Sequence, residues 1–300
     1  MQTQVVYTKK IKMGRAALKE ELVALAFLAP SLGGFLLFYL IPFVQSFGMS
    51  FMSSPINGEF VWLKNYQSLL TNQVFGKAAL NTLLFTGIGV PLLLALSLML
   101  AMALSSKLLG QKALATVFLT PLVIPVASVV LVWQVIFDNN GALNSILAGF
   151  GVDRVDWLKS AWAQYAVMLL FLWKNIGYDM VLFMAALAAV PKEWMESASL
   201  DGANALQKFR HIVWPRLLPT TFFVLVISII NSFKVFREVY LLAGAYPHDS
   251  IYTLQHFMNN MFSSLDYQKL TSAAFIMAVA IVGLVMALFS ARRRIGRYSA

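Results

Sequence analysis

The 300-residue chain contains no cysteine and few charged residues, and both shortages narrow what it can be. Without cysteine it can form neither disulfide bonds nor thiolate metal sites. Its three histidines, His211, His248 and His256, are not spaced as metal ligands usually are. The sequence also lacks the Gly-x-x-x-x-Gly-Lys-Ser/Thr phosphate loop, so we expect no P-loop ATP hydrolysis by this chain.

Charged residues make up only 12% of the chain, whereas hydrophobic residues make up 59%, and the mean hydropathy is +0.73. A soluble domain of this length needs far more charge to cover its surface. The composition therefore predicts an integral membrane protein.

Six apolar segments have about the 20 residues that a helix needs to cross a bilayer. They are Leu22–Val44, Ala78–Leu104, Ala113–Phe137, Ala161–Val190, Leu217–Phe233 and Leu270–Ala291. Only the fourth contains charges, Lys174 and Asp179. The alternating ten-residue segments of a membrane barrel are missing, so the sequence predicts an all-α polytopic membrane protein with six transmembrane helices.

Lysine and arginine are distributed unevenly between the two sides that six helices create. One side carries fifteen cations and five acids, and the other carries five cations and six acids. The fifteen are Lys9, Lys10, Lys12, Arg15, Lys19, Lys107, Lys112, Lys192, Lys208, Arg210, Arg216, Arg292, Arg293, Arg294 and Arg297. The positive-inside rule places that side in the cytoplasm. Because this topology explains the net charge of +10, the charge does not indicate a nucleic-acid partner.

The chain therefore divides into a cytoplasmic tail over residues 1–21, a membrane domain over residues 22–291 and a basic cytoplasmic tail over residues 292–300. The apolar segment after the first tail is longer than the roughly 7–15 apolar residues of a signal peptide, so we interpret it as a retained helix. Residues 15–23 form either an interfacial helix or a simple extension of the first span.

The loop over residues 191–216 has a pattern typical of two short helices. Pro191 suits a helix start, and Lys192–Leu200 then places Trp194 on an apolar side. Asp201-Gly202 predicts a turn, because glycine accepts a positive φ. The loop is either a helix-turn-helix knob that meets a soluble partner or a connector along the membrane interface.

At this loop the chain resembles the inner-membrane permease subunits of bacterial ABC importers, in particular their carbohydrate branch. The matching residues are Glu196, Ser197, Ala198, Asp201, Gly202, Ala203, Gln207, Phe209, Ile212, Pro215 and Pro219. Ser197 replaces an alanine of the family motif, which exchanges one small residue for another. Further matches are Trp173, Gly177, Met180, Phe233, Phe236 and Tyr240.

The resemblance implies a type I importer permease fold in a bacterial cell membrane. In the family, two permease subunits, here expected to differ, form a lipid-embedded path for a sugar or sugar derivative. Two copies of an ATPase, which hold ATP and Mg, dock on the cytoplasmic loop corresponding to residues 191–216, and a periplasmic or extracellular binding protein delivers the solute. The chain itself is expected to bind no cofactor, no metal and no nucleic acid. The alternative is an ion-coupled secondary transporter, which should show an internal repeat.

Polar residues within the fourth and fifth spans are candidates for the solute path, because a charge in hydrocarbon costs about 3 kcal/mol. The candidates are Trp173, Lys174, Asn175, Tyr178, Asp179, Asn231, Lys234, Arg237, Glu238 and Tyr240. Their aromatic rings would stack on a sugar and their polar groups would bond its hydroxyls. Alternatively, the pairs Lys174–Asp179 and Lys234–Glu238 are ion pairs that only hold the bundle together.

The predicted topology can be tested with single cysteines, because the chain has none of its own. In intact cells, an impermeant thiol reagent should label Asn140→Cys and leave Ser106→Cys and Ser299→Cys unlabelled. Labelling of the latter two with protection of the first would reverse the assigned orientation.

Overall fold

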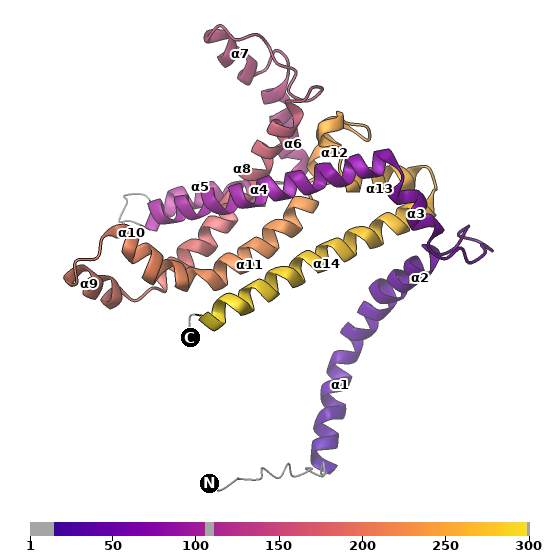
Figure 1. The fold of residues 1–300 in the computed structure, drawn as a ribbon, viewed down its shortest axis with the longest axis horizontal. Coiled ribbons are helices and arrows are strands. Elements are labelled where there is room, and N and C mark those ends of the chain that lie inside the picture. Colours follow the sequence, from indigo (N-terminus) through magenta and orange to yellow (C-terminus); the bar gives the residue numbers. More distant parts are fainter. Residues whose placement is uncertain (1–14, 106–110, 299–300) are drawn as a thin grey trace.

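The structure is a computed structural model that describes residues 15–105 and 111–298, without the side chains of residues 15–18, 20–22, 112 and 291–298. Across the described residues the fold is helical, and six helical segments are long and apolar enough to span a membrane (Figure 1). They are Val23–Met49, Gln73–Ser105, Val126–Gly149, Ala163–Ala188, Ala205–Ala243 and Tyr267–Ser290. The predicted all-α fold with six spans is thus confirmed. The expectations for residues 1–14, Ser106, Lys107 and Ser299 lie outside the described residues.

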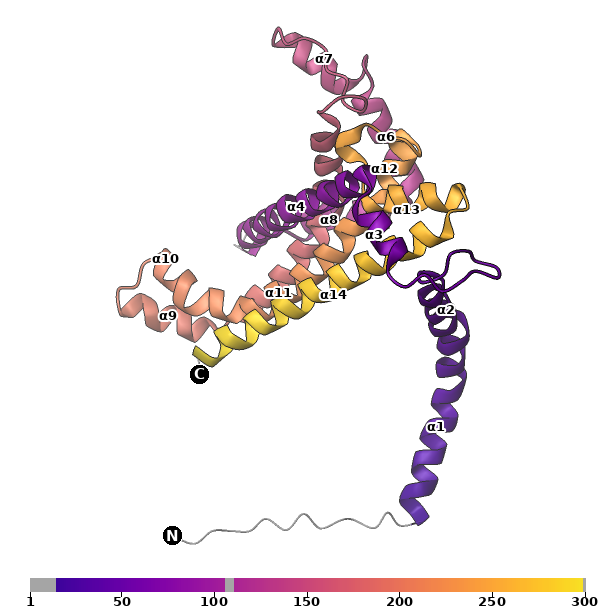
Figure 2. The same ribbon diagram turned by 45° about the vertical axis from the view of Figure 1, so that its right-hand side comes forward.

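The first span stands apart from the other helices. α1 (Arg15–Phe35), the π-helix η1 (Leu36–Leu40) and α2 (Ile41–Met49) form a rod that diverges from the bundle toward the N-terminus (Figures 1 and 2). None of its most apolar window is buried within the chain. α2 meets the bundle at α14 (Tyr267–Tyr298), where the ring of Phe47 packs 4.8 Å from that of Phe275. Because α1 begins at Arg15 without a turn, residues 15–23 extend the first span.

Prolines explain the two π-helical segments. A proline offers no N–H to the carbonyl four residues before it, and its ring crowds that carbonyl. η1 ends two residues before Pro42, and η2 (Phe209–Val213) ends two residues before Pro215. The wider π turn relieves the clash, so both helices continue through their proline.

The prediction of one helix over residues 113–137 is wrong. α5 (Gln111–Val123) ends and α6 (Val126–Phe137) begins on either side of Ile124 and Pro125. Pro125 has φ −55° and ψ 136°, which is extended backbone. Proline disfavours helical geometry in the residue before it, so the pair breaks the helix.

α4 (Gln73–Ser105), α8 (Ala163–Ala188) and α11 (Trp214–Phe233) form the centre of the bundle, and α5 packs against α8. Met180, Phe183 and Val224 share one buried core at these contacts. Gly177 allows α5 and α8 to touch, because a Cβ at this position would overlap the backbone carbonyl of Phe118.

Between α6 and α8 the chain makes an excursion that carries α7 (Ala142–Gly149) away from the other helices (Figure 1). Asn144 holds this excursion together and is only 1% exposed. Its Nδ2 donates to the carbonyls of Asn139 and Val155 at 3.1 and 2.9 Å, and its Oδ1 accepts from Trp157 Nε1 at 3.0 Å. The buried amide thus ties the two ends of the excursion together, and Leu143, Trp157 and Leu158 pack it on the hydrophobic core beside α6.

The remaining elements gather at two ends of the molecule (Figures 1 and 2). α9 (Lys192–Leu200) and α10 (Ala205–Lys208) lie at one end, as does the end of α14 (Tyr267–Tyr298). α3 (Lys64–Leu70) and α13 (Leu254–Ser263) lie at the other. α14 continues past residue 291, so the expected basic tail is an extension of the last helix as far as residue 298.

Replacing Gly177 tests the close approach of α5 and α8. Gly177→Ala should destabilise the purified protein by about 1–3 kcal/mol, because the added methyl forces two backbones apart. The measurement is the thermal unfolding midpoint in detergent. Gly87→Ala is the matched control, since no atom lies within 4 Å of its added Cβ. Equal midpoints for the two variants would contradict the contact.

Candidate functional site

Two polar contacts join α8 to α11 in the centre of the bundle. Asn231 Nδ2 donates to Asn175 Oδ1 at 3.2 Å, and one turn along the helices Ser228 Oγ donates to Asp179 Oδ2 at 2.8 Å. Asn175 also donates to the carbonyl of Phe171 at 2.8 Å. The four-residue spacing that places Asn175 and Asp179 on one face is therefore used to bind the neighbouring helix.

An ion pair links α8 to the helix that follows α11. The Lys174 Nζ binds Glu238 Oε1 of α12 (Phe236–Ala243), and the two side chains are only 18% and 7% exposed. The alternative pairs Lys174–Asp179 and Lys234–Glu238 are not formed. Glu238 Oε2 is buried without a hydrogen-bond partner among the described residues. The pair fixes α12 against α8 across a turn at Lys234 and Val235.

Beside this ion pair lies a cavity of about 250 Å³. It is lined by Leu122, Leu170, Phe171, Lys174, Asn175, Asn231, Lys234, Val235, Arg237 and Glu238. Six of the ten solute-path candidates thus meet in one place, although they come from three helices and an intervening turn. Polar groups over an apolar wall are the mixture expected of a small-molecule site.

Four candidates lie elsewhere. Asp179 is buried against Ser228 and does not line the cavity. Trp173 packs with Trp133, their ring centroids 5.6 Å apart, and Tyr240 packs with Phe236 at 5.5 Å. Tyr178 is half-buried on α8. Phe171 is the one aromatic residue among those lining the cavity, but it is only 2% exposed and packs on Phe85, with ring centroids 5.3 Å apart. It backs the cavity wall, and the sequence did not single it out.

Several serine and threonine side chains that bond to a neighbouring helix were not predicted from the sequence. Besides Ser228, Ser97 Oγ of α4 donates to the carbonyl of Ile176 at 3.3 Å, and Thr86 and Ser232 share a hydrogen bond of 2.9 Å. No sequence signal distinguishes these residues, because serine and threonine in helices also bond the carbonyl four residues earlier.

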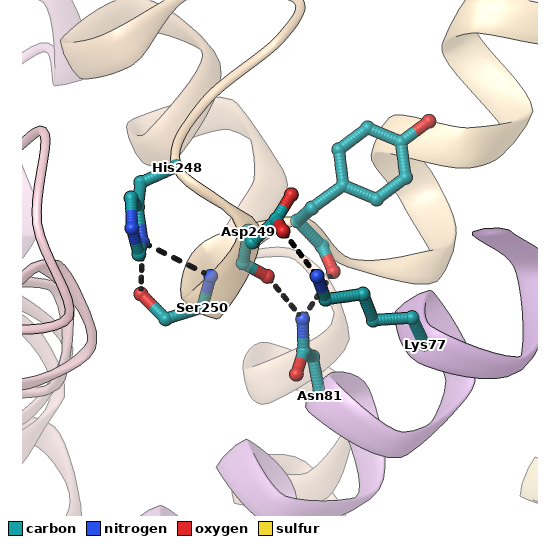
Figure 3. Close-up of polar contacts among 6 residues, drawn as sticks. Lys77, Asn81, His248, Asp249 and Ser250 are labelled. Carbon is teal, nitrogen blue, oxygen red and sulfur yellow. Dashed lines mark hydrogen bonds and ion pairs between the residues drawn. The ribbon is translucent and has the colours of Figure 1, made fainter.

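At the end of the bundle opposite α9 and α10, a loop between α12 and α13 is tied to α4 (Figure 3). Lys77 forms an ion pair with Asp249, and Asn81 Nδ2 donates to the Asp249 and Tyr252 carbonyls at 2.6 and 2.9 Å. The hydrogen bond from Lys77 holds the pKa of the Asp249 carboxyl below its usual value. The loop contains η3 (Asp249–Ile251) and leaves Tyr246 exposed.

At the other end, the predicted helix-turn-helix knob over residues 191–216 is present. Gly202 has φ +80° and turns the chain between α9 and α10. Asn204 and Gln207 form a reciprocal capping box at the start of α10, which satisfies two unpaired N–H groups. Lys208 Nζ donates to Ser199 Oγ at 2.7 Å, and the Arg216 guanidinium lies 4.3 Å from the centre of the Trp194 ring. These contacts hold both short helices against the start of α11.

The motif residues occupy distinct parts of this knob. Glu196, Ser197, Asp201 and Gly202 are exposed, whereas Ala198 and Ala203 are half-buried. The remaining three, Phe209, Ile212 and Pro215, belong to η2 and the first turn of α11. Leu200 and Leu206 are 90% and 73% exposed at the tip. The knob thus combines acidic groups with apolar side chains that nothing in the described chain covers.

No group of three or more His, Cys, Asp or Glu side chains that could hold a metal ion occurs within residues 15–105 and 111–298. The cavity and the knob are the two places where the residues singled out from the sequence come together.

The sequence profile of the family "Binding-protein-dependent transport system inner membrane component" matches residues 93–297, more than half of the chain. The chain is 31% identical over 285 residues to "Probable ABC transporter permease protein YesP" of Bacillus subtilis, covering 92% of this chain and 91% of that protein. It is 37% identical over 224 residues to the "Arabinooligosaccharides transport system permease protein AraP" of the same organism, covering 72% and 70%.

A solved structure has a similar fold. It is a "bacterial alginate ABC transporter in complex with alginate pentasaccharide-bound periplasmic protein". One of its chains is similar to this one with a TM-score of 0.81 and 23% identity, over 93% of this chain and 97% of that one.

Breaking the buried ion pair tests its structural role. Lys174→Gln should lower the free energy of unfolding by about 3–5 kcal/mol, because it leaves the Glu238 carboxylate buried and unpaired. The double variant Lys174→Gln/Glu238→Gln should recover most of this loss. Unfolding is followed by the protein's tryptophan fluorescence in detergent.

Lys269→Gln is the control, since its ion pair with Asp266 is more exposed and should contribute at most about 1 kcal/mol. A double variant that is no more stable than the single one would show that Lys174 and Glu238 act independently.

Proposed function

The chain belongs to the family of binding-protein-dependent transport system inner membrane components, and we propose that it is one of two different permease subunits of an ABC importer for a sugar or sugar derivative. A partner ATPase, in two copies, binds ATP and Mg and supplies the energy. A periplasmic or extracellular binding protein delivers the solute. Both termini and the knob over residues 191–216 face the cytoplasm of a bacterial cell.

The knob is the observation that carries this proposal. Its leucines Leu200 and Leu206 are 90% and 73% exposed at the tip, where a docked partner would bury them. Glu196 and Asp201 beside them offer charge to the same partner. Because α10, η2 and α11 are consecutive along the chain, a movement of the knob would move the membrane helix α11 with it.

The first span supports a second permease subunit. α1, η1 and α2 bury none of their most apolar window against the rest of the chain. The cavity is also incomplete, because Lys234 and Arg237 at its edge remain exposed. A second subunit would cover the first span, and its contact with the edge of the cavity would close the cavity into a path.

The nature of the solute rests on the named relatives and on the cavity. The name of one relative, AraP, assigns it to arabinooligosaccharide transport. Another relative is the "sn-glycerol-3-phosphate transport system permease protein UgpA" of Yersinia pestis, which is 28% identical to this chain. Amide and ionic groups over an apolar wall suit a hydroxylated solute. The family match favours this importer over an ion-coupled secondary transporter.

Substitutions in the knob test the coupling. Gly202→Val forces a side chain into a positive φ, at a cost of about 1 kcal/mol or more, and should disturb the docking turn. Glu196→Lys reverses an exposed charge without affecting packing. Both variants should insert normally yet co-purify with less ATPase and support less uptake.

Each variant has a matched control in the excursion between α6 and α8. Gly151→Val meets the same strain, with φ +74° and no atom within 4 Å, and Asp153→Lys makes the same charge reversal at an exposed site. ATPase co-purification should be unchanged in both controls. If the knob variants co-purify with the ATPase as well as these controls do, the knob has no coupling role.

A further inference from the structure

The charges that line the cavity are unbalanced. Lys174, Lys234 and Arg237 contribute three cations, whereas Glu238 is the single acid among the lining residues. Asp179, the other acid of these two spans, is engaged with Ser228 and does not face the cavity. The cavity wall therefore carries a net charge of +2.

The two excess cations are Lys234 and Arg237. Lys174 is neutralised by Glu238, but neither Lys234 nor Arg237 has a side-chain hydrogen bond or ion pair with any residue that the structure describes. Both side chains are exposed at the edge of the cavity. They lie just beyond the predicted span Leu217–Phe233, so both charges remain solvated but are not neutralised at the edge of the cavity.

A neutral sugar would not compensate this charge. Its hydroxyls could accept hydrogen bonds from the cations, but they carry no charge to offset the net positive potential. A carboxylate or phosphate does, and a guanidinium binds either group with two parallel hydrogen bonds. A cleft lined by one sign of charge and bounded by apolar walls also concentrates counter-ions.

We propose that the solute of this permease is anionic, a sugar that bears a carboxylate or a phosphate group. Lys234 and Arg237 bind the anionic group, while Asn231 bonds a hydroxyl and the exposed Leu122 supplies an apolar wall. This inference rests on the proposed function, because it names the class of cargo that the same path carries.

The test measures the charge of the cavity in the assembled complex, independently of transport. Asn231→Cys places a single thiol in the cavity of a chain that otherwise has no cysteine. The complex in detergent is treated with the anionic reagent sulfonatoethyl methanethiosulfonate or the cationic trimethylammonioethyl methanethiosulfonate. Labelling of this chain is followed by its mass.

The anionic reagent should react faster, and the ratio of anionic to cationic rates should fall about tenfold when Lys234→Gln and Arg237→Gln are added to the Asn231→Cys chain. Lys159→Gln, which removes a cation from the excursion beyond α7, should leave the ratio unchanged. A ratio that is unaffected by Lys234→Gln and Arg237→Gln would overturn the proposal. It would mean that acids of the partner subunit already neutralise the two cations.

Competition then identifies the anionic group. Digalacturonate, galactose 6-phosphate and neutral galactobiose are compared for their ability to slow labelling of Asn231→Cys. Protection by digalacturonate assigns a carboxylate, and protection by galactose 6-phosphate assigns a phosphate. Protection by galactobiose equal to that of the anions, or none by either anion, contradicts an anionic cargo. Failure of the importer itself would instead be seen as absent ATP-driven uptake with the labelling ratio intact.

Discussion

Hydrocarbon offers no hydrogen-bond partner to a polar group, so every such group within the spans of this chain has to find one inside the protein or in water. The backbone meets this requirement by forming helices, and prolines are accommodated by π turns or by an outright break. Side chains meet it by crossing between helices, as Asn175 does to Asn231 and Lys174 to Glu238. Among the charged residues of the cavity, Lys234 and Arg237 have no ion-pair partner in the described chain, and their exposed side chains mark the edge that water or solute can reach.

Local sequence was enough to predict five of the six spans and the two short helices of the knob, because both depend on local rules. Long uncharged segments have few alternatives to membrane helices, and the Pro191 and Asp201-Gly202 signals lie next to the helices they delimit. The break at Pro125 was missed because prolines within membrane helices are often tolerated, as Pro30, Pro91 and Pro121 are here. Local sequence does not say which proline ends a helix.

The partners of the buried charges could not be predicted from one sequence. Lys174 and Asp179 are five residues apart and point about 140° away from each other on a helix, so they cannot easily pair. Lys234 and Glu238 have the favourable four-residue spacing, but the helix is interrupted at Lys234 and Val235. The observed pairs depend on how α8, α11 and α12 pack, which is a tertiary property. Cavity and knob are nevertheless joined by α11, which starts at one and ends at the other.

The separation of the buried partners along the chain also bears on biosynthesis. Glu238 follows Lys174 by 64 residues, and Ser228 follows Asp179 by 49. The ribosome therefore delivers the fourth span to the bilayer with both charges unpaired. The mean hydropathy of that span, 1.4, is also well below the 2.3 of the second span. Each unpaired charge opposes insertion of that span by about 3 kcal/mol. Glu238 and Ser228 become available only when α11 and α12 emerge, so completion of the fifth span stabilises the fourth span after its insertion.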